Sequence, residues 1–378
     1  MRSYRFRLYP SKLQERQLNT HLWLAKNLWN DLLGHSKDTY RDFDKFPTRN
    51  SLQLMVKDTG LFSQTAQEIA HRVESGIWRY VKLRKAGNTK VGFPRFKPFE
   101  RMRSLHYPQF GFSLEQKLKV TPFGELSIVK HREIKGKIKT LTLKREASGK
   151  WFACFAVEET PIIMPPNGKP RVGIDLGLMR LATLSDEHVV ENPRLVRKHE
   201  EKVASLSRQL SKKRKGSMNR KKAKRLLAME HEQLRDTRRD FLHWRSRKLV
   251  NSYSLIALED LAIKEMAEQR FGKQINDASW GELAGMVRYK AESAGCEAVF
   301  VNPEGTTKEC CVCGNRKDMP LSERVYDCEV CGNHMYRDLN AAKNILKRAT
   351  AGSVGSNACG DGAEVPSGNQ EAHAFRRG

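Results

Sequence analysis

The stretch RVGIDLGLMRLATL (Arg171–Leu184) places one carboxylate, Asp175, inside an apolar segment between Gly173 and Gly177. An apolar run of this kind is typical of a buried strand, and here it predicts the strand that opens a new domain. A buried, unpaired carboxylate is costly, because its charged form loses hydration. The two glycines either leave room for a substrate to approach or serve strand packing and a turn. The stretch therefore raises the question of what offsets the charge of Asp175.

The overall charge indicates the class of partner. The chain has 378 residues, with 69 Lys and Arg against 43 Asp and Glu, and a formal net charge of +26. A chain of this length holds two or three domains, or one core with insertions. Nucleic acid is the default partner of so basic a protein, with an anionic membrane surface and simple solubility as alternatives. We find no long apolar span and no signal peptide, so we expect a cytoplasmic protein without a membrane partner.

Before the opening stretch, the residue pattern changes twice. From residue 11 to about 84, apolar residues recur at helical spacing and predict a helical bundle. The next stretch, KLRKAGNTKVGFPRFKPFERMRS, interleaves phenylalanines with basic residues. This mix suits nucleic-acid binding, with Arg95 and Lys97 as candidate contacts, or a packed surface loop. From about 105 to 159, alternation broken by Gly turns predicts a small β-barrel or sheet, and the prolines of TPIIMPPNGKP predict a linker.

A long charged region, residues 192–250, follows the opening strand and predicts two helices. It is interrupted by SKKRKGSMNRKKAKR, whose Gly216 suggests the tip of a helical hairpin. A solvated helix face normally mixes charge signs, whereas this tip is single-signed, which favours phosphate contact. The candidate contacts at the tip are Lys212, Lys213, Arg214, Lys215, Arg220, Lys221 and Lys222.

The cysteines give the most specific local signal. CCVCG and CEVCG form two C-x-x-C-G turns, and each turn directs two thiolates at one point. Two such turns complete a tetrahedral shell of four thiolates for Zn²⁺, which leaves no open position and so predicts a structural site. Cys311 falls outside the pattern. The predicted ligands are Cys310, Cys313, Cys328 and Cys331.

Acidic residues recur near the ends of predicted elements. Asp175 lies in the Gly-flanked strand, Glu259 ends the apolar strand SLIALEDLAI, and Asp338 lies where a helix begins in YRDLNAAKNIL. Singly, Asp338 could be an N-cap and Glu259 a surface residue. Together, converging carboxylates can hold two Mg²⁺ ions for phosphodiester hydrolysis. Arg337, beside Asp338, either contacts the scissile phosphate or makes a structural contact, at the surface or to the cysteine turns.

The motifs VGIDLG, IALEDL and RDLNAAKNIL, with the four-cysteine segment between the second and third, resemble a known family. They are similar to the split RuvC nuclease domain of the TnpB (OrfB) proteins of small bacterial and archaeal insertion sequences, relatives of compact type V CRISPR nucleases. Supporting matches are RFRLYPSKLQ, GFPRFK, RRDFLHWRSRKLV and DASWGEL. The resemblance spans nearly the whole chain except its tail.

The resemblance implies an α/β multidomain protein. Its parts are an RNase H-like RuvC nuclease domain with an inserted zinc ribbon, and an N-terminal β-barrel (wedge) domain interrupted by a helical recognition domain. The boundaries that follow are 1–10 and 105–165 for the wedge, 11–104 for the recognition domain, 166–304 and 336–349 for RuvC, 305–335 for the zinc ribbon and 350–378 for a disordered tail.

The resemblance also implies RNA-guided cleavage of double-stranded DNA. A guide RNA from the transposon end pairs with the target, and the protein reads a short motif beside it. Because base pairing then selects the target sequence, the protein mainly binds the phosphate backbones of the nucleic acids, which fits its positive charge. Asp175, Glu259 and Asp338 match the family's catalytic Mg²⁺ ligands, and the four cysteines match its zinc ligands.

Two other functions are open on the sequence. A guide-bound DNA-binding regulator without cleavage activity is one, although an inactive relative is expected to lose a carboxylate and this chain keeps all three. A transposase that joins DNA ends is the other, and it needs a strand-transfer function that no motif here indicates.

Overall fold

The computed structural model describes residues 1–160, 164–268, 272–320 and 322–351. As far as these residues go, the chain forms two compact units. Unit 1 joins the chain up to residue 160 to residues 196–237, and unit 2 joins residues 164–195 to the chain from 238 on. Part of the predicted linker and, from residue 352 on, the predicted disordered tail lie outside the described residues.

Unit 1 is built on an antiparallel seven-stranded sheet with the order β2-β6-β7-β1-β5-β4-β3. Its edge strands, β2 and β3, are joined by residues 108–111 alone, a connection that spans at most about 17 Å. A flat sheet of seven strands would separate its edges by about 29 Å. The sheet must therefore curl until it nearly closes. The strands are β1 Arg2–Tyr9, β2 Ser104–Tyr107, β3 Phe112–Leu114, β4 Leu118–Val120, β5 Gly124–Val129, β6 Lys137–Arg145 and β7 Trp151–Glu158.

Helices α1 (Lys12–Phe43), α2 (Arg49–Leu54) and α3 (Ser63–Lys85) are inserted between β1 and β2, before the short η1 (Phe99–Arg101). Helix α1 begins with a capping box, in which Ser11 and Gln14 satisfy each other's backbone N–H groups. The predicted apolar stripe is buried between α1 and α3 and is continuous with the core of the sheet.

The charged region forms α4 (Leu195–Ser211) and α5 (Met218–Ser252), the hairpin that its sequence predicts. A hydrogen bond and an ion pair hold α4 to α5 in unit 1: His199 and Lys202 both contact the buried carboxylate of Glu230, at 2.6 and 2.5 Å. No helix in the described ranges is long and apolar enough to cross a membrane.

Unit 2 contains a five-stranded sheet with the order β10-β9-β8-β11-β12, in which β8, β11 and β12 are parallel and β9 and β10 are antiparallel to their neighbours. The opening stretch begins with β8, the strand that its sequence predicts, but it then turns at residues 177–179 and continues as a second strand, β9. The mixed α/β class is thus confirmed. The strands are β8 Arg171–Leu176, β9 Arg180–Leu184, β10 Val189–Glu191, β11 Leu255–Glu259 and β12 Glu297–Val301.

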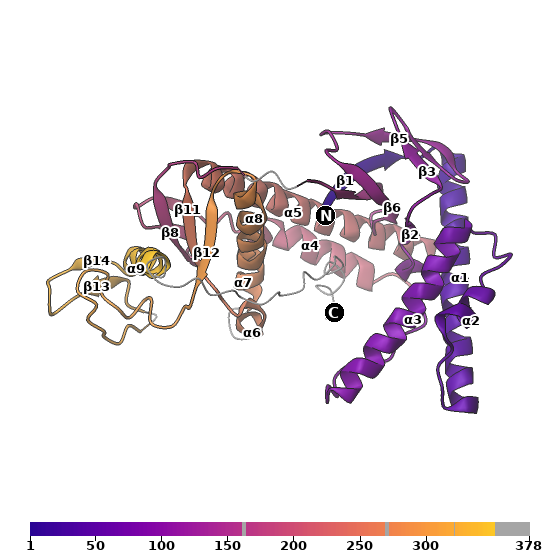
Figure 1. The fold of residues 1–378 in the computed structure, drawn as a ribbon, viewed down its shortest axis with the longest axis horizontal. Coiled ribbons are helices and arrows are strands. Elements are labelled where there is room, and N and C mark those ends of the chain that lie inside the picture. The colour runs from indigo at the N-terminus through magenta and orange to yellow at the C-terminus, as the bar shows by residue number, and fades with distance from the viewer. Residues whose placement is uncertain (161–163, 269–271, 321, 352–378) are drawn as a thin grey trace. The chain divides into compact units, whose positions relative to one another are not determined.

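Each face of this sheet is covered by different helices. One face packs against the last part of α5 together with α7 (Gly272–Ala278) and α8 (Trp280–Glu292) in the larger core of the unit. The short α6 (Ile263–Ala267) precedes them. The other face packs against α9 (Arg337–Ala351) through a small apolar cluster. In Figure 1, α9 lies beside β8 and the hairpin of β13 (Val325–Asp327) and β14 (His334–Tyr336).

Gly173 permits the close contact between β8 and α9. A Cβ atom at this position would lie 2.1 Å from Ala342 O and 2.7 Å from Leu346 N, both backbone atoms of α9. Of the two roles that the sequence leaves open for this glycine, helix packing on the strand is the one that the structure shows. Gly177 serves the turn, since its Cβ would lie 2.9 Å from Arg180 O in the β8–β9 connection.

We expect Gly173→Ala to lower the free energy of unfolding by about 1–3 kcal/mol, because the backbone of α9 must move away from β8. The matched change Gly285→Ala, on the exposed face of α8 with nothing within 4 Å, should raise it by up to about 1 kcal/mol through helix propensity. Chemical denaturation of both variants measures the difference. Equal effects of the two substitutions would contradict this role of Gly173.

Candidate metal centres

Asp175 and Glu259 are neighbours on adjacent parallel strands. The register of β8 and β11 ends with Ile174 beside Leu258, so the next residue of each strand places the two carboxylates side by side. Side chains two apart along a strand share a face, and Asp175 thus lies on the same face as Gly173. This is the face that α9 covers. The strands therefore direct both carboxylates toward α9.

Asp338 is contributed by the first turn of α9. It is the second residue of the helix and stands one turn before Ala342, whose carbonyl lies against Gly173. The contact at Gly173 thus brings the N-terminus of α9 to the end of β8 that carries Asp175. The helix dipole favours negative charge at this position. The three carboxylates that the sequence singles out therefore come from three elements and meet on one face of the sheet.

The carboxylate of Asp175 is buried at 9% exposure, and no described residue donates a hydrogen bond to it. Burial raises its pKa well above the ordinary range, and the negative charges of Glu259 and Asp338 raise it further, whereas the Arg337 guanidinium lowers it. Such a group is unfavourable as an ion unless a cation joins it. Carboxylate oxygens are the ligands that Mg²⁺ prefers, so the donor chemistry of the three side chains suits a divalent cation.

Glu259 has a partner of its own. The hydroxyl of Thr306 donates a hydrogen bond to Glu259 Oε1 at 2.5 Å. Burial raises the pKa of Glu259, while the Thr306 hydrogen bond and the charge of Arg348 lower it. The sequence analysis did not identify Thr306.

Arg337 is largely buried, and its guanidinium is committed to the protein. It donates to the backbone carbonyls of Glu323, at 3.1 Å, and Pro320, at 3.4 Å, and lies 3.6 Å from Asp338. Of the two roles open for it on the sequence, the structure supports a contact to the cysteine-bearing segment.

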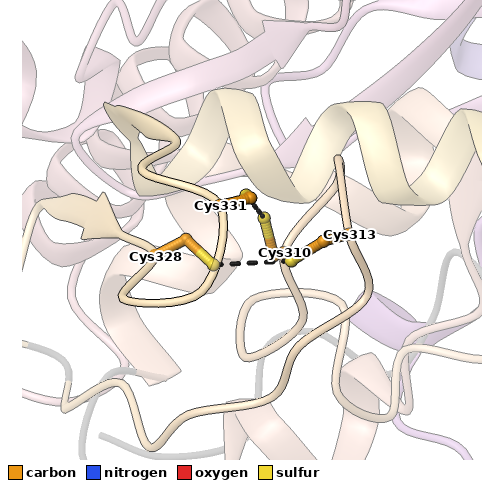
Figure 2. A group of neighbouring side chains, drawn as sticks. All are labelled: Cys310, Cys313, Cys328 and Cys331. Atoms are coloured by element: carbon orange, nitrogen blue, oxygen red, sulfur yellow. Dashed lines mark hydrogen bonds between the residues drawn. The ribbon is translucent and has the colours of Figure 1, made fainter.

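The four cysteines of the two C-x-x-C-G turns converge, as Figure 2 shows. Their Sγ atoms all lie within 4.8 Å of one another, with 3.7 Å between Cys310 and Cys331 and 3.5 Å between Cys313 and Cys328. Four thiolates about 2.3 Å from a tetrahedral Zn²⁺ ion are about 3.8 Å apart. The spacing of the four sulfur atoms is close to that of a tetrahedral zinc site.

The two cysteine turns have the same backbone structure. In the first, Gly314 adopts a positive φ and donates to Cys310 O, and in the second, Gly332 does the same toward Cys328 O. Burial would raise the pKa of the Cys310 thiol, but the backbone N–H groups of Cys313 and Val312 point at its sulfur and lower the pKa to about 6. The backbone N–H groups of the first turn therefore stabilise the thiolate form of Cys310.

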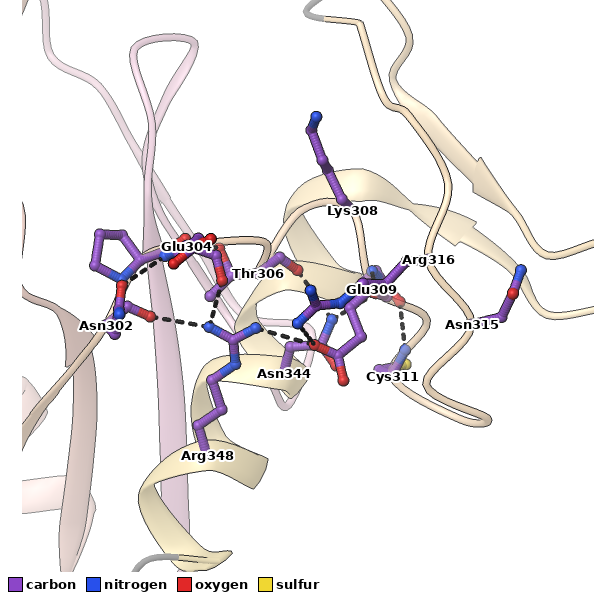
Figure 3. A network of polar contacts seen from close by, with 12 residues as sticks. Asn302, Glu304, Thr306, Lys308, Glu309, Cys311, Asn315, Arg316, Asn344 and Arg348 are labelled. Carbon is purple, nitrogen blue, oxygen red and sulfur yellow. Dashed lines mark hydrogen bonds and ion pairs between the residues drawn. The ribbon is translucent and has the colours of Figure 1, made fainter.

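A polar network links α9 to residues 302–311, the segment that leads into the first cysteine turn (Figure 3). Asn340, Asn344 and Arg348, spaced one turn apart on α9, donate mainly to backbone carbonyls of this segment. Asn340 also accepts a hydrogen bond from the backbone N–H of Cys311 at 2.9 Å. The sequence analysis missed these residues, although a polar stripe at helical spacing in an Ala-rich helix is a visible signal.

The basic residues proposed to contact nucleic acid have different surroundings. At the α4–α5 turn, the candidates are exposed except Arg220, whose guanidinium donates to the carbonyls of Leu210 and Lys213 and closes the turn. Arg95 is exposed. The ammonium group of Lys97 lies 3.1 Å from the centre of the Trp29 ring, and burial lowers the pKa of Lys97 to about 7, with a smaller effect from Arg72.

Three protein-family models match the chain. The OrfB family of IS605-type elements, described as "Probable transposase", matches residues 154–270, and a "Cas12f1-like, TNB domain" matches residues 280–345. A third, described as "Helix-turn-helix domain" of the same OrfB group, matches residues 1–45, which here form strand β1 and the single helix α1.

Two similar proteins extend over nearly the full chain. The "Putative RNA-guided DNA endonuclease" of Streptomyces pristinaespiralis is 29% identical, covering 96% of this chain and 91% of the relative. The "Putative RNA-guided DNA endonuclease InsQ" of Escherichia coli K12 is 27% identical, with 92% of each chain covered. Among solved structures, a Cas12f1 chain in complex with single-guide RNA and target DNA has a similar fold, with a TM-score of 0.58 at 15% identity over 89% of this chain and 83% of that one.

We expect Asp175→Asn to raise the melting temperature of the protein at neutral pH when no magnesium is added. Because the folded-state pKa of Asp175 is raised, ionisation of this carboxylate costs stability as the pH rises from the ordinary carboxyl range toward neutrality. The gain should therefore shrink as the pH is lowered. Asp318→Asn, at an exposed carboxylate, should have little effect. A pH-independent loss of stability in Asp175→Asn would refute the assignment.

We expect one zinc ion per chain, which Cys328→Ser removes because three thiolates hold zinc far more weakly than four. Cys311→Ser is the matched control, since Cys311 lies beside the cluster but outside it. Metal analysis of the purified proteins gives the zinc content. Full zinc occupancy in Cys328→Ser, or loss of zinc in Cys311→Ser, would show that the ligand set is wrong.

Proposed function

Because the chain belongs to the TnpB (OrfB) family of insertion-sequence proteins, we propose that it is an RNA-guided DNA endonuclease. The observation that carries this proposal is the convergence of Asp175, Glu259 and Asp338, from β8, β11 and α9, on one face of the unit 2 sheet. Relatives that cover more than 90% of the chain carry the name of this activity. Guide RNA from the transposon end and double-stranded DNA beside a short recognition motif are the proposed partners.

The proposed catalytic residues are the three carboxylates, which would hold two Mg²⁺ ions. When bound, these ions supply an activated water and stabilise the leaving oxygen of the phosphodiester. Asp175 and Glu259, fixed on a rigid sheet, would set the position of the site, and Asp338 would close it from α9. Thiolates of Cys310, Cys313, Cys328 and Cys331 would hold a structural zinc ion, with no part in the reaction.

The domain assignments follow from the same premise. Residues 166–304 and 336–349 would form the RNase H-like RuvC domain, with the zinc ribbon at 305–335. The curled sheet of unit 1 would be the wedge domain, residues 1–10 and 105–165, and helices α1 to α3 the recognition domain, residues 11–104. The exposed cations of the α4–α5 turn would bind nucleic-acid phosphates, which accounts for their single sign.

We expect Asp175→Ala to abolish cleavage of a target library while co-purification of guide RNA persists, because this carboxylate would bind metal and not RNA. The protein is purified with its co-expressed RNA, the RNA is sequenced, and matching DNA is tested with and without Mg²⁺. Asp318→Ala, at an exposed carboxylate of the same unit, is the control and should cleave normally.

Cleavage by Asp175→Ala at the wild-type rate would overturn the catalytic assignment. A wild-type protein that binds guide RNA and target without cutting would instead identify a DNA-binding regulator.

A further inference from the structure

The hydroxyl group of Thr306 is placed to control the Glu259 carboxylate. Thr306 is 2% exposed, and its Oγ1 lies 2.5 Å from Glu259 Oε1 and 3.1 Å from Pro303 O. A hydroxyl has one proton to donate, and the nearer, charged oxygen is the stronger acceptor. The proton of Thr306 thus points to Glu259, and Glu259 Oε2 is left for another partner.

Thr306 is itself held from α9, as Figure 3 shows. Asn344, 2% exposed, donates from Nδ2 to Thr306 O at 2.9 Å and to Glu309 O at 2.6 Å. Arg348, one turn later, donates to the carbonyls of Asn302 and Glu304 on the other side of Thr306. The backbone at Thr306 is therefore fixed on both sides by one helix.

The same helix carries Asp338. A glutamate at a strand end has several free side-chain torsions, and ordering it costs conformational entropy. A hydrogen bond from a fixed hydroxyl orders the glutamate side chain before a cation binds, so cation binding no longer has to supply that entropy loss. Groups that orient a metal ligand in this way raise its affinity for the metal. The network thus fixes the position of the Glu259 side chain relative to Asp338, because Glu259 is linked to α9 through Thr306 and Asn344.

We infer that Thr306 is a positioning residue, which fixes the Glu259 carboxylate for a divalent cation and is in turn held in place by Asn344. The inference rests on the proposed function for the role of Glu259, and it concerns binding of the cation ahead of any reaction. Thr306 contacts neither the substrate nor the cation in this account, since its hydroxyl proton is donated to Glu259 Oε1.

The test compares Thr306→Val, which keeps the shape and removes the hydroxyl, with Thr306→Ser, which keeps the hydroxyl. Thr307→Val is the matched control, because the Thr307 hydroxyl bonds to no described residue. Binding of Mn²⁺ to the full-length, zinc-loaded protein is measured by electron paramagnetic resonance without nucleic acid. Cleavage by the guide-RNA complex is then titrated with Mg²⁺.

We expect Thr306→Val to weaken Mn²⁺ binding by about 10–100-fold and to raise the half-maximal Mg²⁺ concentration for cleavage in parallel. Thr306→Ser should restore most of both, and Thr307→Val should match the wild type. Thr306→Ala replaces the valine variant if the latter has lost zinc or its cooperative melting transition.

Wild-type Mn²⁺ affinity in both hydroxyl-free variants would overturn the inference and leave the proposed function intact. Failure of the wild-type complex to cut DNA would count against the proposed function, while the Mn²⁺ measurement would still decide the role of Thr306. Weak binding in Thr306→Ser as well would also overturn the inference, because the hydroxyl would then not be the group that matters.

Discussion

The packing of α9 against β8 at Gly173 is the contact on which the rest of the candidate site depends. Backbone atoms of α9 lie where a Cβ atom of residue 173 would be. The helix therefore approaches the strand more closely than any residue other than glycine at position 173 would permit. Asp338 lies one turn before Ala342 in α9, and Asp175 lies two residues after Gly173 in β8. The meeting of these two carboxylates is therefore a consequence of helix–strand packing.

This arrangement concentrates negative charge where little of it is neutralised by the protein. Asp175 is buried with a raised pKa and receives no hydrogen bond from a described residue. Within the described part of the chain, Glu259 has a direct polar partner in Thr306, and Asp338 has one in Arg337. A folded protein tolerates such repulsion when a bound ligand offsets it. The proposed divalent cations have the charge and the preference for oxygen ligands to do so.

The cysteine-bearing segment adds a second level of organisation. It interrupts the chain between β12 and α9, and its lead-in is bound to α9 by Asn340, Asn344 and Arg348. The same lead-in carries Thr306 to Glu259. A structural zinc ion at the four thiolates would therefore stabilise a segment that reaches the carboxylates through a few hydrogen bonds. The cysteine-bearing segment is therefore connected to the carboxylates through α9 and Thr306.

The sequence predicts the strand with Asp175, the helical hairpin and the cysteine turns, because each is encoded by residues close together in the chain. It does not predict Thr306 or the use of Gly173, since both depend on contacts between distant segments: Thr306 meets Glu259 across 47 positions. The sequence does not predict the surroundings of Arg220 and Lys97 for the same reason. A basic residue looks the same in a sequence whether its side chain is exposed to solvent or contacts a carbonyl or an aromatic ring.

The most direct measurement of the central claim is anomalous diffraction at the manganese edge from crystals of the full-length protein grown with Mn²⁺. The account predicts anomalous density between Asp175, Glu259 and Asp338, with carboxylate oxygens about 2.2 Å from the metal. Crystals saturated with Mn²⁺ that show no density at these three carboxylates, or show it at another site alone, would contradict the account.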